Sequence, residues 1–504
     1  MGNSRHTAST FVLDDDSLLH VFYLSRPFFR EEDGSAEWRY NGRWWYALAH
    51  VCRRWRNIVL GSATYLDLTL LCTYGTPVAD MLAHSPPLPI VVGYFRIDRL
   101  ITAEDEEGII HALKQRNRVR RVRLYTVFTL GTILEKFVAT MDEDYPSLEY
   151  LYITLPLEDH RILRFPGTLQ APNLRHLTLQ GFALTVGSRL LTTAAPVGLV
   201  TLHLVMLHPS TYFHPNTLLQ WISLMPQLET LTIYLKYSIL TREVERLLSQ
   251  MPIIAPIAAP NLRHFNFRGV SPYLEALVHR FTTPLLEKLT IELFTQLTYF
   301  VPSLLQFINA TENLRFDHAV ISFSRERVDA VVYSHGETKV PSLNIVVNCR
   351  HFFSQAFSMG QIFESLGQIF SEVDHLVLQH RVINESSEWR QEVYVWVDRT
   401  QWRILLRPFG NVKTLCIRAQ HGIDFGLSQC LKLEDGELPI GLLPNLHELE
   451  YYGYDTGDAF TSFIDARRKA GCPVTLVRSS SQRSSEPSSD VSAISSANIE
   501  DGNT

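Results

Sequence analysis

A short leucine-rich segment recurs along most of the chain, and this repeat restricts the possible folds more than any other feature. It follows the pattern Pro-x-Leu-x-x-Leu-x-Leu, as in PNLRHLTL at 172–179 and PQLETLTI at 226–233. Two further units are expected near 311–320 (TENLRFDHAV) and 340–348 (VPSLNIVVN), where most of the pattern is lost. Clear copies begin at residues 145, 171, 225, 259, 283 and 443, and weaker copies begin at 116, 196, 370 and 409.

Each copy predicts a short strand, because its last two leucine positions alternate with the period of two that places side chains on one face. Apolar residues at helical spacing follow, as at 133–141, 218–225 and 274–281. One strand and one helix cannot bury their apolar sides alone, so neighbouring units stack. We therefore predict an α/β fold: an irregular leucine-rich-repeat solenoid of strand-helix units with a curved parallel sheet, over residues 113–478. The alternative is an ordinary α/β protein with leucine-rich strands, but the recurring proline favours the solenoid.

The residues between the leucines of each predicted strand point away from the core, along one face of the sheet. They combine aromatic side chains with both charges, a mixture that suits recognition of another protein. The candidate target-binding residues are Arg121, Tyr152, His176, Tyr234, His264, Arg268, Lys288, Arg418, Glu450 and Tyr452.

Composition excludes several classes of function. The net charge is −6, which argues against nucleic acid as a partner. Six scattered cysteines with no Cys-x-x-Cys pair argue against zinc and disulfides and favour a reducing, intracellular location, cytoplasmic or nuclear. We expect no signal peptide and no membrane segment. Phosphate-loop, Gly-x-Ser-x-Gly and His-Glu-x-x-His motifs are absent, so we expect no cofactor and no enzymatic activity. An enzyme whose site is assembled from distant loops stays open as an alternative.

Residues 11–70 read as a separate helical module with an insert at about 25–44. The first helix starts after Asp14, Asp15 and Asp16, whose carboxylates suit a helix N-terminus better than a metal ion. The second part, LAHVCRRWRNIVLG, has apolar residues at 48, 51, 55, 58 and 59, which predicts one helix or a close helix pair ending at Gly61. Its apolar stripe fits either packing within the module or docking on another protein.

Two stretches of this module resemble an F-box. LDDDSLLHVFYL resembles the first half of that motif, with Asp14 where the family has proline, and ALAHVCRRWRNIVLGSATYLDLTL resembles the second half, with its Val-Cys-Arg-x-Trp core. The residues that follow are similar to those of mushroom-type fungal F-box proteins with leucine-rich repeats. The resemblance implies an N-terminal three-helix F-box-like bundle that binds a Skp adaptor of a cullin-type ubiquitin ligase. It implies adaptor contacts, partly shared with the core of the module, from Leu13, Leu18, Val21, Val51, Cys52, Trp55 and Ile58.

Together these observations predict a substrate-recognition adaptor of a Skp-cullin-F-box ubiquitin ligase, which holds an unknown protein target on its concave sheet. The alternative is a leucine-rich-repeat interaction scaffold that is not attached to a ligase. The predicted organisation is a flexible N-terminus (1–10), the helical module (11–70), a connecting or capping region (71–112), the solenoid (113–478) and a disordered Ser-rich tail (479–504).

Overall fold

The protein, represented by a computed structural model, has a mixed α/β structure with one long, mostly parallel sheet. The predictions for residues 1–10, for most of the insert and for 479–504 lie outside the residues that the structure describes. Within that part of the chain the sheet has sixteen strands, accompanied by fifteen α-helices. The described residues are 13–27, 43–95, 102–125, 131–155, 163–184, 188–192, 195–207, 213–235, 256–311, 313–314, 316–324, 326–333, 341–349, 352–380, 399–418, 423–432, 441–452 and 460–478.

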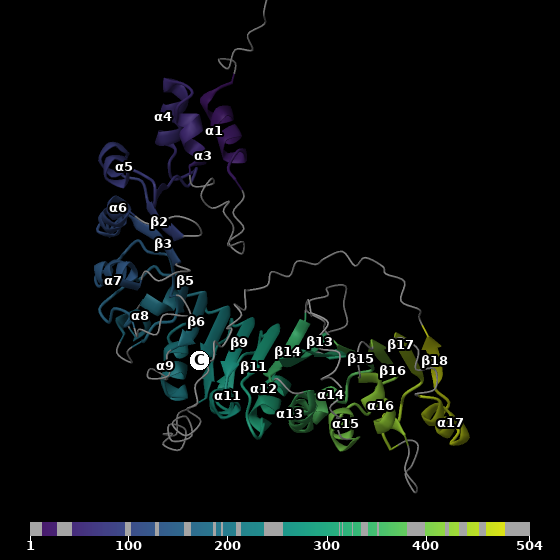
Figure 1. Cartoon of the computed structure of the whole chain (residues 1–504). Helices are drawn as coiled ribbons and strands as arrows, with labels where there is room; N and C mark the ends of the chain where they lie inside the picture. Colours follow the sequence, from purple (N-terminus) through teal and green to yellow (C-terminus); the bar gives the residue numbers. More distant parts are fainter. Residues whose placement is uncertain are drawn as a thin grey trace, which may run out of the picture.

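Three short helices stand at one end of the sheet: α1 (Asp15–Leu24), α3 (Trp44–Ala49) and α4 (Arg53–Gly61) (Figure 1). Of the two possibilities that the sequence left open, the structure shows the close helix pair, since α3 and α4 are separate; the predicted end at Gly61 is confirmed. The cap is confirmed for Asp14, whose Oδ1 accepts a hydrogen bond of 2.6 Å from the backbone amide of Ser17, but Asp15 and Asp16 lie within the first turn of α1 and not before it as predicted.

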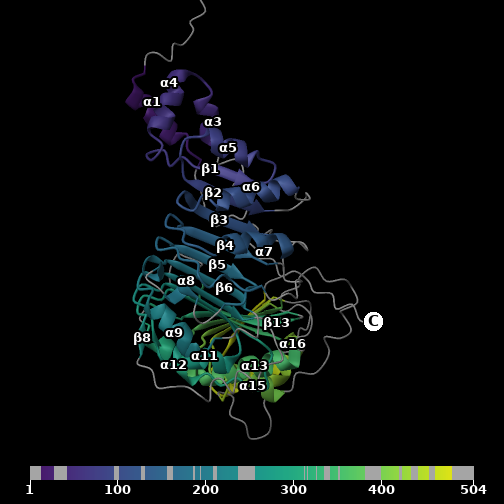
Figure 2. The same cartoon turned by 90° about the vertical axis from the view of Figure 1, so that its left-hand side faces the viewer.

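The sheet is an arched ribbon in which sequence neighbours mostly lie side by side (Figures 1 and 2). A separate pair of short strands consists of β8 (Ile257–Ala258) and β10 (Phe281–Thr282). The ribbon runs in the order β1 (Leu70–Thr73), β2 (Ile90–Phe95), β3 (Val119–Tyr125), β4 (Tyr150–Thr154), β5 (His176–Gln180), β6 (Thr201–Leu207), β7 (Thr230–Leu235), β9 (His264–Gly269), β11 (Lys288–Leu293), β14 (Pro341–Asn348), β13 (Arg327–Tyr333), β12 (His318–Phe323), β15 (His375–His380), β16 (Thr414–Arg418), β17 (Glu448–Tyr452) and β18 (Thr475–Arg478).

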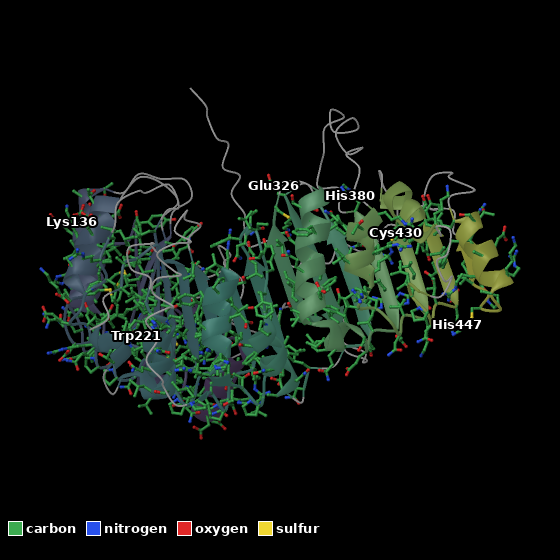
Figure 3. The ribbon with its side chains drawn as sticks, turned by 90° about the horizontal axis from the view of Figure 1, so that it is seen from below. Lys136, Trp221, Glu326, His380, Cys430 and His447 are labelled. Carbon is green, nitrogen blue, oxygen red and sulfur yellow. The ribbon has the colours of Figure 1, made fainter. Side chains whose placement is uncertain are left out.

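The remaining helices cover the outer, convex side of the arch, and none of the described helices covers the inner side (Figures 1 and 2). Figure 3 shows the two edges of the sheet: Glu326 and His380 lie where parallel strands end, and His447 lies where one begins. The outer helices are α5 (Val78–His84), α6 (Ala103–Leu113), α7 (Gly131–Thr140), α8 (Arg189–Thr192), α9 (Pro215–Ser223), α11 (Ser271–Val278), α12 (Pro302–Asn309), α13 (Phe352–Ser365), α14 (Gly367–Phe370), α15 (Arg399–Leu406), α16 (Ile423–Leu431) and α17 (Thr461–Lys469), with a 3-10 turn at Ala195–Gly198.

Every clear or weak copy of the repeat forms one strand of this ribbon, as predicted. The last two leucine positions are buried under the helices: Leu177 and Leu179 of β5 are 0% exposed, and Leu177 lies in register with Leu151 of β4. The same alignment continues along the sheet, so the core is a stack of leucine rows. Truncating one such leucine to alanine costs roughly 2–5 kcal/mol.

A ladder of hydrogen bonds explains the asparagine that often follows the proline of the repeat. Asn173 Nδ2 donates to the carbonyl of Pro146 at 2.7 Å, which joins one unit to the unit before it. Asn261 makes the same bond to Pro226 at 2.8 Å. These bonds satisfy carbonyl groups of the turns that lead into the strands, where strand pairing has not yet begun.

The two degenerate units near 311–320 and 340–348 are not simple members of the series, and here the expectation of an uninterrupted parallel sheet is wrong. Strand β13 was not foreseen, and it is antiparallel to both β12 and β14. The connection from β12 to β13 is a tight turn in which the amide of Ser324 donates to the carbonyl of Arg327 at 3.0 Å. A turn this short leaves no chain for the crossover that a parallel pair requires.

Candidate protein-binding surfaces

The two motif halves of the N-terminal module meet through Arg54 and Trp55 of α4. Arg54 Nη2 donates to the carbonyl of Leu13 at 2.6 Å, and Arg54 Nε donates to Asp15 Oδ1 at 2.8 Å. The rings of Trp55 and Phe22 lie 4.8 Å apart between centroids. Arg54 therefore ties the start of α1 to the first turn of α4, and Trp55 packs against the buried side of α1.

Several apolar side chains of this module face solvent although its core is formed. Leu13, Val21 and Val51 are 44%, 46% and 58% exposed. Leu24, which the sequence analysis missed, is 68% exposed and lies three residues after Val21, on the same side of α1. Because isolated exposed apolar residues are common but a group of them on one small module is not, this surface is a candidate docking site.

The other predicted adaptor-binding residues take three different positions. Leu18 is 2% exposed, so its assignment to the docking surface is corrected: it faces inward with Phe22 and belongs to the core. Trp55 and Ile58 are half-buried at the margin of that core. Cys52 is exposed at the N-terminus of α4, where its Sγ accepts a hydrogen bond of 3.5 Å from the amide of Trp55.

A polar network fastens the helical module to the first strands. Asp67 forms ion pairs with Arg26, at 2.7 Å, and with Arg120. Its backbone is left-handed, with a φ of 52°. Arg120, which immediately precedes an inner-face position of β3, also pairs with Glu149 at 2.8 Å. Trp45 Nε1 adds a hydrogen bond of 3.1 Å to the carbonyl of Thr69. The module is therefore braced against the first strands by these ion pairs and this hydrogen bond.

All ten predicted target-binding residues lie on the inner face of the sheet. Their strands alternate between buried positions, which face the helices, and half-buried or exposed positions, which face the hollow of the arch. The register sorts these residues into rows across the strands, for example Arg121 of β3, Tyr150 of β4 and His176 of β5. Binding by these residues stays a prediction, while their location on one face is shown.

Contacts between neighbouring strands hold the inner-face side chains in place. The guanidinium carbon of Arg123 lies 5.0 Å from the centre of the Tyr152 ring. Arg268 pairs with Glu292 at 3.2 Å, and Asn348 Nδ2 donates to the same carboxylate at 2.6 Å. Burial raises the pKa of the Tyr152 phenol, and the positive charge of Arg123 opposes that rise.

Histidines on this face form contacts that the sequence did not reveal. His318 of β12 and His375 of β15 stack with ring centroids 4.5 Å apart, because β12 pairs with β15 although 57 residues separate the two histidines. Burial and the neighbouring His375 lower the pKa of His318. Burial, helped by His176, lowers the pKa of His203 to about 4. His203 is therefore held in its neutral form at pH 7.

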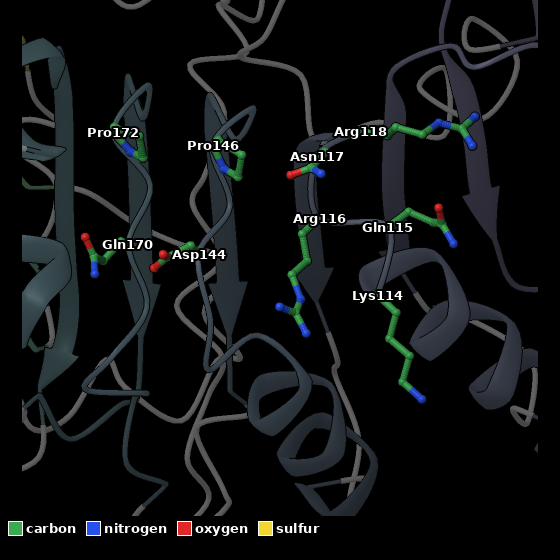
Figure 4. Close-up of a pocket in the computed structure, with 9 residues that line it drawn as sticks. All are labelled: Lys114, Gln115, Arg116, Asn117, Arg118, Asp144, Pro146, Gln170 and Pro172. Carbon is green, nitrogen blue, oxygen red and sulfur yellow. The ribbon is translucent and has the colours of Figure 1, made fainter.

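A shallow groove of about 710 Å³ lies outside the inner face, where the chain enters β3, β4 and β5 (Figure 4). Both of its arginines already have partners in the structure. Arg116 forms an ion pair with Glu143, and Arg118 donates to the carbonyls of Leu88 and Pro86 at 3.1 and 3.3 Å. The groove is thus a space between repeat turns whose arginines have structural partners.

Comparison with known proteins adds no relative: no family model matches the chain, and no curated protein matches it. Among the described residues, no helix has the length and apolar character to cross a membrane. The same residues contain no group of three or more His, Cys, Asp or Glu side chains placed to hold a metal ion. All six cysteines are free thiols.

Proposed function

We propose that the chain is a non-catalytic, F-box-type recognition subunit of a Skp-cullin ubiquitin ligase, present inside the cell. In this proposal the α1, α3 and α4 module is an F-box-like bundle that binds a Skp adaptor. The observation that carries it is the exposure of Leu13, Val21 and Val51 on a module whose core is already complete. These residues belong to the two sequence stretches that resemble the motif, and Arg54 joins those stretches in space.

The sheet is the proposed target-binding part, as a leucine-rich-repeat solenoid. Its support is that each repeat copy forms one parallel strand of the sheet, and that the described helices lie on the outer side only (Figure 1). The inner face offers a long row of polar and aromatic side chains with no described helix over it. Such a subunit acts by proximity: it holds a target near a ubiquitin-charged enzyme that other subunits supply.

The adaptor contact can be tested with one exposed valine and a matched control. Val51→Glu places a charge in the proposed interface, whereas Val197→Glu makes the same change at a similarly exposed valine (54%) in the 3-10 turn between β5 and β6, outside the helical module. Each apolar anchor of an interface contributes about 2 kcal/mol or more. We expect a purified Skp adaptor to bind the wild-type chain and Val197→Glu equally, and to bind Val51→Glu at least about tenfold more weakly. A wild-type chain that binds no Skp adaptor contradicts the proposal.

One observation favours the alternative, a repeat scaffold outside any ligase. The network around Asp67 and the Trp45 bond make the helical module an end cap for the first strands. Repeat arrays need such caps, because the terminal unit otherwise exposes its apolar core. The alternative predicts that Val51→Glu changes neither folding nor any partner contact.

A further inference from the structure

We propose that the inner face at β3–β5 binds an acidic segment of the protein target, through Arg121 and Arg123 flanked by tyrosines. That the bound segment belongs to a ubiquitination target rests on the proposed function. The binding of an acidic segment does not itself require a Skp adaptor. The ligand chemistry is an extended peptide with carboxylate or phosphate groups.

The charges of the inner face are divided unevenly along the ribbon. From β3 to β7, the described inner-face positions include two arginines, and none carries a carboxylate. The first carboxylate beyond them is Glu292 of β11, which is engaged by Arg268 and Asn348. The β3–β7 positions are Arg121, Arg123, Tyr125, Tyr150, Tyr152, Thr154, His176, Thr178, Gln180, Thr201, His203, Val205, Thr230, Thr232 and Tyr234.

Near the opposite end of the ribbon, carboxylates join Arg418 of β16 on the inner face. Strand β17 presents Glu448 and Glu450 on the inner face, and the hydroxyl of Tyr452 lies 3.4 Å from Glu450 Oε2. The nearby carboxylate of Glu450 is the main cause of the raised pKa of Tyr452. The charges of the inner face therefore favour the binding of an acidic segment at the β3 end over the β17 end.

The geometry at β3 suits an extended peptide. Arg121 and Arg123 are two residues apart on one strand, so their side chains leave the same face about 7 Å apart. Alternate side chains of an extended ligand have the same spacing. Guanidinium groups bind carboxylates and phosphates in a two-pronged manner, which makes arginine the favoured residue for such ligands.

Aromatic neighbours orient these arginines. Tyr150 and Tyr152 lie in register with Arg121 and Arg123 on the next strand, and Arg123 lies over the Tyr152 ring at 5.0 Å. Tyr150 in turn packs near His176, with ring centroids 5.9 Å apart. The tyrosine rings limit the motion of the guanidinium groups and supply apolar surface beside the charge. This combination of a fixed cation and an aromatic wall is typical of binding hot spots.

A peptide fits the face better than a nucleic acid does. The whole chain carries a net charge of −6, and the same face presents two carboxylates at β17, so a long polyanion that reached β17 would be repelled there. A short acidic segment confined to β3–β5 avoids this repulsion. The residues 479–504 of the chain are themselves acidic and are a competing occupant that the experiment must distinguish.

The test is fluorescence anisotropy of labelled peptides with the full chain. A peptide of alternating Glu and Ser, the same peptide with phosphoserine, and a Lys-Ser peptide are compared. The variant is Arg121→Ala/Arg123→Ala. The matched control is Arg175→Ala/Arg263→Ala, which removes the same charge from two exposed arginines at the sheet edge, outside the inner-face rows.

We expect one or both acidic peptides to bind and the Lys-Ser peptide not to bind. The Arg121/Arg123 variant should bind at least about tenfold more weakly, and the control should match the wild type within about twofold. The stronger of the two acidic peptides identifies carboxylate or phosphate as the preferred group. Equal losses in variant and control, binding only of the Lys-Ser peptide, or no binding at all would overturn the proposal.

Two further measurements separate this proposal from the others. If the acidic peptides bind only after residues 479–504 are deleted, those residues are the natural occupant of the site, and the proposal of a target segment is overturned. Skp adaptor binding by the Arg121/Arg123 variant should equal that of the wild type, since both residues lie away from α1 and α4. Loss of adaptor binding in the wild type, with acidic-peptide binding intact, contradicts the proposed function and leaves the acidic site in place.

Discussion

Lowering the pH from 7 to 5 should destabilise the fold through His203. This residue lies in the middle of the inner face of β6, in register with Thr178 of β5 and Thr232 of β7. Burial, together with the nearby His176, lowers its pKa from 6.5 to about 4 in the folded chain. The unfolded chain has no such environment, and its histidine keeps an ordinary pKa near 6.5.

The direction of the effect follows from proton binding. At pH 7 both states are mostly neutral at this residue, and the pH has little influence. Between pH 6.5 and 4, His203 is protonated in the unfolded state but stays neutral in the folded state. The free energy of unfolding therefore falls as the pH falls. With the pKa of His203 at about 4 in the fold, this loss reaches at most about 2 kcal/mol at pH 5.

The assay is denaturant unfolding at both pH values for the wild type, His203→Gln and His447→Gln. Glutamine keeps a neutral hydrogen-bonding side chain but does not titrate, and His447 is an exposed histidine at the sheet edge (Figure 3). We expect His203→Gln to lose about 2 kcal/mol less than the wild type between pH 7 and 5, and His447→Gln to behave as the wild type. Equal losses in all three chains would refute the reasoning.

Three further changes test other parts of the structure. Gly181→Ala should destabilise the chain by about 2–4 kcal/mol in the same assay, because φ is +81° and the new Cβ would lie 2.9 Å from Leu155 Cβ; a stability equal to that of the wild type contradicts this. Asp67→Asn should cost about 1 kcal/mol, since it weakens partly exposed ion pairs without changing the left-handed backbone preference, and a variant with unchanged stability would show that the brace is dispensable. In iodoacetamide labelling of the native chain at pH 8, followed by mass spectrometry, exposed Cys52 should react well before Cys349, because burial raises the pKa of Cys349 to about 12; equal rates would contradict the burial.

Local patterns in the sequence predicted most of the framework. The spacing of leucines predicted the strand in every recognisable copy of the repeat. It could do so because the burial of alternate side chains is a local consequence of strand geometry. The helical character of this stretch and the end of α4 at Gly61 followed from apolar spacing and a glycine, but the division into two helices did not. Leu18 was misplaced because a helical stripe does not show which of its members faces the core and which faces solvent.

The reversal at β12–β14 could not be predicted in the same way. Pairing between strands is a long-range property that the local pattern of each strand does not encode. The stacking of His318 on His375 depends on that pairing, so it could not be foreseen either. One local sign of the interruption is present in the sequence: the proline and most leucine positions of the repeat are lost at 311–320.

Strand β3 links the two proposed surfaces, because it carries residues of both the brace and the inner face. Arg120 of β3 is part of the brace that holds the helical module, while Arg121 and Arg123 of the same strand face the hollow of the arch. A target bound at β3–β5 is therefore placed next to the module and not at the distant β17 end. Asp67→Asn should then leave acidic-peptide affinity and adaptor affinity unchanged, yet reduce ubiquitin transfer to a target in a reconstituted ligase, because only the relative orientation of the two surfaces is loosened. An unchanged transfer rate would show that the brace has no role beyond stability.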